Sequence, residues 1–403
     1  MKSVQPHKNW KPTLLLWGVG LAVTLVISAV TRLWVLTAIP VGFLFGFFLE
    51  KADLCGASAF SEMIMMKDRE KFWGLCTVIV VSMIGFALLS ALGWVKLNPK
   101  PLIWANYIVG GIAFGIGSVL AGGCISGCLF KSGQGNINSM AGLVGIALGV
   151  AAVLHGPLQG FEGFLKQFII KNADHSSVTF SSVTGLPYWV LALLFGVIAV
   201  IFAAISKNKP QAPATVIKKE DLPALERIVT RSWRPWQAGI AVRVLACFAH
   251  LSSAASGREL PPGSDPRCFM PVANRCAVKP RWLRAKGNAA FPQKGRPCKT
   301  GKCRVACQKV SCWLILEVIF LVAGSFTSAK LSGKIRFLPR PPDQTVVAFW
   351  RYSSGCGSHH CRRVRGGQHH ERSGAYDVGN VLFLVTVVLA NWATTSCTSW
   401  AAG

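Results

Sequence analysis

Two cysteines stand where long apolar runs are interrupted, and their thiols could contact a ligand there. Cys124 lies in the sequence AGGCISG at 121–127, and Cys55 follows the polar stretch EKAD at 50–53. Adjacent glycines break a helix and expose backbone amides, which can hold an anion inside a membrane. A thiol is a soft, weak hydrogen-bond donor that suits a sulfur-bearing anion. The predicted substrate-binding residues are Cys55, Gly122, Gly123, Cys124, Ser126 and Gly127.

Cys128 follows Cys124 by four residues, so both thiols can lie on one face of a helix. Such a pair can form a disulfide or bind a soft metal, and the alternative function is therefore a membrane thiol oxidoreductase. The apolar runs contain no second cysteine pair of this kind, no Ser-His-Asp pattern and no paired carboxylates. We therefore predict no enzyme, no cofactor and no metal site. Lys131 either adds positive potential or, as we favour, anchors the membrane interface.

The elements that position these cysteines are expected to be membrane helices. Hydrophobic residues make up 52% of the 403 residues and charged residues only 15%, whereas a soluble chain carries roughly a quarter charged residues. Residues 12–31 and 72–95 contain no charge, and about twenty apolar residues span a bilayer as a helix. These features predict an all-α polytopic protein in a lipid bilayer.

The predicted spanning segments are 13–31, 33–50, 72–95, 103–125, 139–157, 186–206, 236–256, 313–329 and 379–395. Segment 52–66 is too short and polar to span, and we expect it to be re-entrant. The first apolar run is too long for a cleaved signal peptide. With the N-terminus in the cytoplasm, segments 1–11, 51–71 and 207–235 carry fourteen Lys and Arg residues against five on the other side, which favours this orientation.

The predicted domains follow the same pattern. Residues 1–206 form an N-terminal membrane half of about six spanning helices. Residues 207–235 are charged and contain proline, so they form a cytoplasmic linker. Residues 236–403 form a second membrane half that is degraded.

Several stretches resemble one known family. They are EKADLCGASAFSEM at 50–63, GSVLAGGCISGCLFKSGQG at 117–135, TRSWRPWQAG at 230–239, SSAASGRE at 252–259, FLVAGSFTSAKLSG at 320–333 and GNVLFLVTVVLANWATT at 379–395. With these stretches the chain resembles the YeeE/YedE family of sulfur-transport membrane proteins. Residues 33–257 match the family almost throughout, whereas the rest of the chain matches it only in short separate stretches.

The resemblance implies a bundle of inverted repeats with short broken helices, located in the inner (cytoplasmic) membrane. It implies that Cys55, Cys124 and a third cysteine in a repeat of the AGGC motif line a narrow path. Thiosulfate or a related anion would pass by S–H···S contacts without covalent chemistry. A small cytoplasmic sulfur-carrier protein of the SirA/TusA type is the implied partner.

The third cysteine motif is missing, and the hydrophilic string GCGSHHCRRVRGGQHHERSG at 355–374 stands in its place. Shifted forward by one base, the codons from Cys361 onward permit the sequence AGGC-x-x-GNIMSG. The missing cysteine would overlap the codons of Val364 and Arg365. We therefore predict out-of-frame segments near 258–310 and 340–377, which disrupt the second repeat. A non-functional frameshifted product is a further alternative.

The net charge of +27 is concentrated in the same region, since residues 258–309 hold thirteen Lys and Arg residues against two acidic residues. This stretch has no amphipathic period and few aromatic residues between its charges, so we predict disorder and no nucleic-acid binding. A zinc cluster is a weak alternative, because the cysteines have irregular spacing without a C-x-x-C pair. Its ligands would come from Cys298, Cys303, Cys307, Cys312, Cys356, Cys361, His359, His360, His369 and His370.

Overall fold

The computed structural model describes residues 10–31, 33–92, 102–154, 159–165, 167–170, 184–185, 188–207, 226, 229–255, 312–335 and 378–400. Within these ranges the secondary structure is helical, apart from one isolated bridge between Leu102 and Ile170. The predicted all-α class is therefore confirmed. The two segments expected to be out of frame and most of the linker 207–235 lie outside the described residues.

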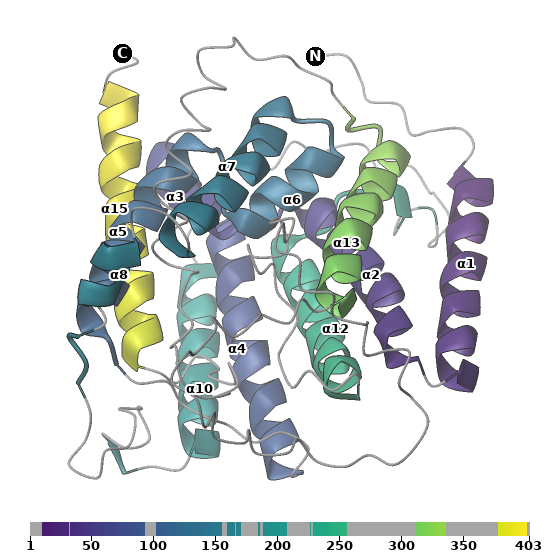
Figure 1. Cartoon of the computed structure of the whole chain (residues 1–403), viewed down its shortest axis with the longest axis horizontal. Helices are drawn as coiled ribbons and strands as arrows, with labels where there is room; N and C mark the ends of the chain where they lie inside the picture. Colours follow the sequence, from purple (N-terminus) through teal and green to yellow (C-terminus); the bar gives the residue numbers. More distant parts are fainter. Residues whose placement is uncertain are drawn as a thin grey trace, which may run out of the picture.

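Each predicted spanning segment coincides with a long helix. These helices are α1 (Trp10–Thr31), α2 (Ala38–Ala52), α4 (Glu70–Ala91), α5 (Trp104–Leu120), α7 (Ile137–Leu154), α10 (Tyr188–Lys207), α12 (Pro235–Ala255), α13 (Cys312–Leu331) and α15 (Val378–Trp400). Shorter helices lie between them, namely η1 (Trp34–Thr37), α3 (Gly56–Met65), α6 (Ile125–Gly133) and α8 (Gln159–Leu165). Figure 1 shows most of the long helices standing side by side, with α1 at the edge of the bundle.

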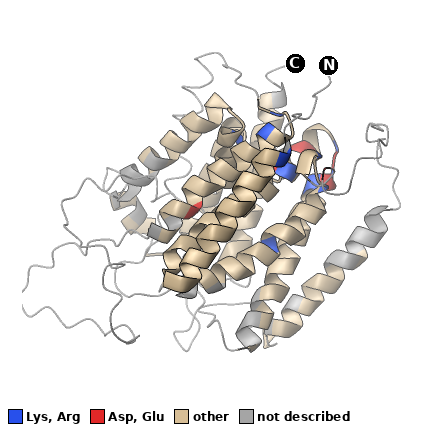
Figure 2. Ribbon diagram, turned by 90° about the vertical axis from the view of Figure 1, so that its right-hand side faces the viewer, with Lys and Arg blue, Asp and Glu red and all other residues tan. Residues whose placement is uncertain are grey.

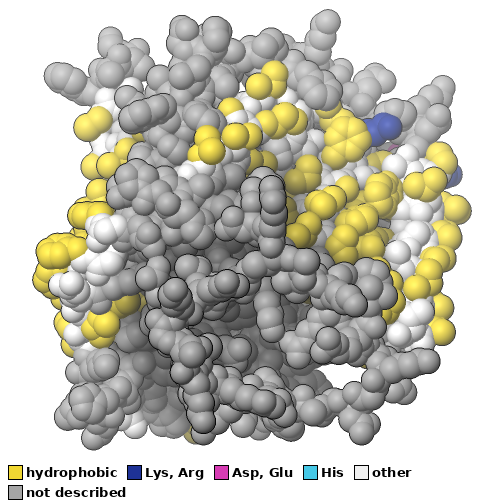
Figure 3. All heavy atoms as spheres, in the orientation of Figure 1, with side chains coloured by type: hydrophobic (Ala, Val, Ile, Leu, Met, Phe, Trp, Pro, Cys, Tyr) yellow, Lys and Arg dark blue, Asp and Glu magenta, His cyan; other side chains and the backbone are white. Residues whose placement is uncertain are grey.

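The outer surface of the bundle suits lipid. Four helical stretches are long and apolar enough to cross a membrane, and they are Lys11–Thr31, Trp34–Met65, Trp104–Gly133 and Val378–Thr398. Large apolar side chains point outward, such as Leu15 and Leu16 on α1, each 68% exposed. Figure 3 shows hydrophobic side chains covering much of the described surface on one face. The chain is therefore a polytopic membrane protein.

Charged side chains are distributed differently from apolar ones. In Figure 2 most Lys, Arg, Asp and Glu residues of the described helices gather at one end of the bundle. This end contains the breaks between α2 and α3 and between α5 and α6. Within the described helices, the charged side chains thus lie mainly at one end of the apolar bundle.

Glycines allow α2 and α13 to pack with their backbones nearly touching. A Cβ atom on Gly42 or Gly46 would collide with the backbone of Glu317 or Leu321, and one on Gly324 would collide with Phe43. Close approach at small residues is a common way for membrane helices to associate. The residue numbers of the two helices increase together along the contact, so α2 and α13 are parallel.

Two further pairs join the two halves of the chain in the same manner. Gly74 of α4 lies against Pro235 of α12, and Gly115 of α5 lies against Ala390 of α15. In both pairs, as in the first, one helix comes from before the linker and one from after it. The inverted-repeat relation that the resemblance implies stays a prediction.

The contact between α2 and α13 generates the first prediction. We expect Gly46→Ala to destabilise the protein by about 1–3 kcal/mol, because the new methyl group must displace the backbone of Leu321. Thermal unfolding in detergent, followed by size-exclusion chromatography of the heated samples, measures the effect. Gly18→Ala on α1 is the matched control, since a Cβ there meets nothing within 4 Å. Equal stability of the two variants would contradict the packing described.

Candidate functional site

The break between α2 and α3 is a compact turn that ends one helix and begins the next. Asp53 has a left-handed backbone, with φ 49°, which an aspartate tolerates better than most residues. The amide of Leu54 donates to the carbonyl of Leu49 at 3.1 Å, and the amide of Asp53 donates to Glu50 at 3.1 Å. This pair of bonds is the Schellman motif, which satisfies the last carbonyls of a helix. Cys55 then caps the N-terminus of α3.

The break between α5 and α6 has the same construction. Gly122 occupies the left-handed position, with φ 73°. The amide of Gly123 donates to Ser118 at 2.9 Å, and that of Gly122 donates to Val119 at 3.1 Å. Cys124 follows as the N-cap of α6. The helix break that AGGC predicts is therefore present, and both breaks place a cysteine two residues after a left-handed residue.

The two cysteines meet although 69 residues separate them. Their Sγ atoms lie 3.5 Å apart, and the Cys124 amide donates to the Cys55 Sγ at 3.4 Å. The Cys124 Sγ also lies 3.2 Å from the Ser126 Oγ. Cys55 is fully buried, whereas Cys124 is partly exposed. The site therefore has one partly exposed cysteine, Cys124, and a second, fully buried cysteine in contact with it.

Gly127 makes this meeting possible. A Cβ atom at this position would lie 2.5 Å from the Cys55 Sγ and 3.7 Å from the Cys124 Sγ. Only glycine therefore leaves room for the Cys55 side chain against the first turn of α6. All six predicted site residues belong to one structure, with Gly122 and Gly123 forming the turn and Cys55, Cys124, Ser126 and Gly127 lying at the sulfur pair. Their role in binding stays a prediction.

The surroundings of the sulfur pair favour negative charge. The helices α3 and α6 both begin at a cysteine, and the N-terminus of a helix carries a partial positive charge and free amide donors. The Lys131 ammonium donates to the Gly122 carbonyl at 2.6 Å, so it lies at the break itself. The sequence favoured an interface anchor for Lys131 and did not indicate this contact, because Lys131 lies nine residues after Gly122.

A buried polar network lies beside the first break. The fully buried Glu50 carboxylate accepts hydrogen bonds from Ser328 of α13 and from the Gln134 amide, the latter at 3.3 Å. Lys334 lies 3.5 Å from the same carboxylate. Glu50 therefore joins the end of α2 to α13 and to the turn after α6, which are the elements that orient both cysteines.

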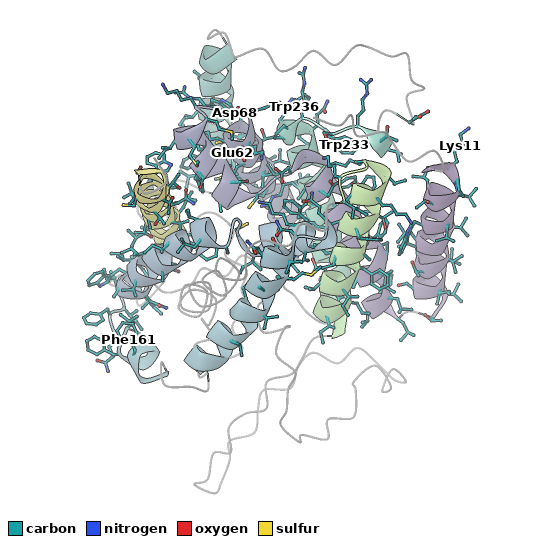
Figure 4. All side chains as sticks on the ribbon, turned by 90° about the horizontal axis from the view of Figure 1, so that it is seen from above. Lys11, Glu62, Asp68, Phe161, Trp233 and Trp236 are labelled. Carbon is teal, nitrogen blue, oxygen red and sulfur yellow. The ribbon has the colours of Figure 1, made fainter. Side chains whose placement is uncertain are left out.

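Lys51 extends this network toward the linker. Its buried ammonium donates to the Val229 carbonyl and to the Ser332 Oγ, the latter at 2.6 Å. The Lys51 carbonyl accepts from the Trp233 amide at 2.9 Å. Figure 4 shows Trp233 toward the middle of the bundle, whereas Lys11 and Phe161 lie at its edges. The sequence pattern predicts a loop position for Lys51, but the side chain is fully buried.

A second group of charged side chains lies at the polar end of the bundle, next to α3. Lys71 pairs with Asp53 at 2.6 Å and with Glu62 at 2.7 Å. Burial opposes the charge of Lys71, but the two carboxylates outweigh this effect and raise its pKa above the ordinary value. The pair of salt bridges connects the break, α3 and the start of α4, so Cys55 is held from three directions.

The C-terminal helix α15 also holds α3. The Ser61 hydroxyl donates to the Asn391 Oδ1 at 3.1 Å, and the Thr395 hydroxyl donates to the Ser61 Oγ at 3.3 Å. Nearby, α5 and α15 border an apolar groove of about 670 Å³ that neither cysteine lines. We assign the site to the Cys55–Cys124 pair, because the groove is lined mainly by apolar side chains and its single cysteine, Cys397, has no second thiol beside it among the lining residues.

Cys128 takes a different position from Cys124. It is fully buried, and its thiol lies 3.7 Å from the Gly123 carbonyl. Both cysteines are free of disulfides. In the described part of the chain, no three His, Cys, Asp or Glu residues are grouped as a metal site requires. Nine of the ten ligands of the possible zinc cluster lie outside that part, and Cys312 begins α13.

The position of Gly127 generates the second prediction. We expect Gly127→Ala to push the Cys55 sulfur away from Cys124 at a cost of about 1–3 kcal/mol, because the methyl group needs its space. Oxidation with copper phenanthroline and mass spectrometry of the linked Cys55–Cys124 peptide measure the separation. The cross-link should form in the unaltered protein and decline in the variant. Gly56→Ala is the control, since a Cβ there meets nothing within 4 Å.

The Glu50 network generates the third prediction. Glu50→Ala removes a buried carboxylate that accepts three partners and should destabilise the protein by about 3–5 kcal/mol. Glu50→Gln keeps an acceptor for Ser328 and should lose less. Thermal unfolding in detergent compares the two variants. A Glu50→Ala protein as stable as Glu50→Gln would contradict a stabilising role for the network.

Comparison with known proteins shows which family the chain is similar to. A family model described as "Sulphur transport" matches residues 51–350. The thiosulfate transporter TsuA of Spirochaeta thermophila is 34% identical over 231 residues, which are 55% of this chain and 64% of the relative. TsuA of Escherichia coli is 26% identical over 226 residues, or 56% and 62% of the two chains. The probable transporter YedE of Escherichia coli is 34% identical over 96 residues, or 23% of each chain.

The matched region is therefore less than two thirds of the length of either TsuA protein. The family model nevertheless covers well over half of the chain, including Cys55, Cys124 and both helix breaks. The chain belongs to the sulphur transport family, the YeeE/YedE family that the sequence motifs resemble.

Proposed function

We propose that the protein carries thiosulfate or a related sulfur-containing anion across the membrane, past Cys124 and Cys55. The observation that carries this proposal is the pair of thiols 3.5 Å apart at the beginnings of two helices. Two relatives that bear the name thiosulfate transporter support it. The two helix N-termini supply the positive potential that an anion needs within an apolar bundle.

In this mechanism the anion first contacts Cys124, which is partly exposed, and then Cys55, which is buried. Each thiol donates a weak S–H hydrogen bond to the terminal sulfur of the anion and forms no covalent bond with it. The first amides of α3 and α6 share the remaining negative charge. Contacts that are individually weak let the anion move on, because a tightly held ion would not leave.

The proposal includes a setting in the cytoplasmic membrane, with the N-terminus inside. The Lys and Arg bias of the predicted cytoplasmic segments supports this orientation. A small cytoplasmic sulfur-carrier protein of the SirA/TusA type would take up the imported sulfur. The resemblance to the family is the support for this partner and for the two membrane halves around a linker at 207–235.

A membrane thiol oxidoreductase that uses Cys124 and Cys128 is less well supported by the geometry. Cys55 lies against the Cys124 thiol, whereas Cys128 is fully buried and directed toward the Gly123 carbonyl. A frameshifted product without transport activity is the remaining alternative, and uptake by cells distinguishes it from the proposal.

The fourth prediction tests the thiols directly. Cells that lack their own thiosulfate uptake and express the chain should accumulate sulfur-35-labelled thiosulfate. Cys124→Ala should reduce uptake to background, because it removes the accessible thiol. Cys128→Ala is the matched control on the same helix and should leave uptake largely intact.

Other outcomes decide against the proposal in different ways. Equal uptake by Cys124→Ala and the unaltered chain would remove this thiol from the mechanism. A Cys128→Ser variant as impaired as Cys124→Ser, with an oxidant-induced bond between the two cysteines, would favour the oxidoreductase. Membrane insertion without any uptake would favour a non-functional product.

A further inference from the structure

The side chain of Lys131 reaches back along α6 to the place where the helix begins. Its Cα lies in the last turn of α6, but its ammonium contacts the carbonyl of Gly122 at 2.6 Å. Gly122 is the left-handed residue of the break and lies two residues before Cys124. A cation therefore lies at the turn that leads into Cys124.

The charges around the site differ in how they are balanced. Lys71 pairs with Asp53 and Glu62, and Lys334 pairs with Glu50. In the described ranges no carboxylate lies within salt-bridge distance of Lys131. Within these ranges the Gly122 carbonyl accepts one of the three ammonium donors, so two donors are left for a ligand. Lys131 is half-buried, so water screens this charge only in part.

We propose that Lys131 is a specificity-determining residue of the cysteine site, which selects anions through the positive charge that its ammonium places at the Gly122 turn, two residues before Cys124. This inference rests on the proposed transport of an anion, and it names the group that distinguishes anions from neutral or cationic sulfur compounds. A divalent anion such as thiosulfate gains more from the charge than a monovalent one, since Coulomb energy scales with the product of the charges.

Two consequences separate the charge from a merely structural contact. If the positive charge of Lys131 selects anions, Lys131→Arg should retain the selectivity for anions and Lys131→Met should lose it. A structural role alone predicts that both variants change the fold or that neither changes selectivity. Lys330, an exposed residue in the last turn of α13, provides Lys330→Met as a control for loss of one positive charge elsewhere.

The decisive measurement uses two methanethiosulfonate probes of similar size and opposite charge on the purified full chain in detergent. One probe carries a sulfonate group and the other a trimethylammonium group. Each forms a mixed disulfide with a cysteine thiol and releases methanesulfinate. Peptide mass spectrometry follows the rate at Cys124 separately from the other cysteines. The ratio of the anionic rate to the cationic rate reports the local field.

We expect the ratio to fall about tenfold in Lys131→Met, the lower end of the effect that a local field has on association rates. Lys131→Arg and Lys330→Met should keep the ratio of the unaltered chain. If Lys131→Met is not monodisperse, Lys131→Gln replaces it with the same expectation. An unchanged ratio in the folded, uncharged variant would overturn the inference.

Thiosulfate uptake gives a second readout, in which Lys131→Met should raise KM more than it lowers the maximal rate. The probe ratio and the uptake measurement test different claims, so each can contradict one claim without the other. A changed probe ratio in a chain without uptake would support the charge selection and contradict the transport function. Uptake that depends on Cys124, with both ratio and KM unchanged in Lys131→Met, would contradict the role of Lys131 alone.

Discussion

The contact between the sulfur atoms of Cys55 and Cys124 is the constraint on which the described site depends. It requires two broken helices whose new N-termini face each other, and it requires that Gly127 carry no side chain. Each break uses the same turn, with a left-handed residue followed by one linking residue and a cysteine. Because this turn satisfies the carbonyls of the helix that ends, the free amides of the helix that begins remain available to a ligand.

Part of this arrangement could be predicted from the sequence. The Gly122–Gly123 pair specifies a left-handed turn, since glycine adopts positive φ without steric cost, and the uncharged runs specify the long helices. The polar residues before Cys55 predict the break there, but the residue that adopts the left-handed conformation is Asp53 rather than a glycine. The proximity of the two cysteines came only from the resemblance to a family, because no local pattern encodes a contact across 69 residues.

The polar contacts could not be predicted, and the reason is the same in each case. A charged residue next to a helix break has the sequence signature of a loop in water, so Lys51 was counted among cytoplasmic loop charges. In the structure Glu50 and Lys51 are both fully buried, because Ser328, Ser332 and Val229 supply partners from distant parts of the chain. Lys131 likewise contacts the turn at the other end of its own helix. Burial and pairing of a charge depend on tertiary neighbours that periodicity does not reveal.

The second half of the chain has a role in the site even without a third AGGC motif. The glycines of α2, α4 and α5 pack against α13, α12 and α15, and Asn391 of α15 hydrogen-bonds to Ser61 of the helix that Cys55 begins. Without these partners, the close-packing faces of the first half would lose their contacts, and the Glu50 carboxylate would lose Ser328 and Lys334. The cysteine pair therefore belongs to both halves: the first supplies the thiols, and the second holds the helices that bring them together.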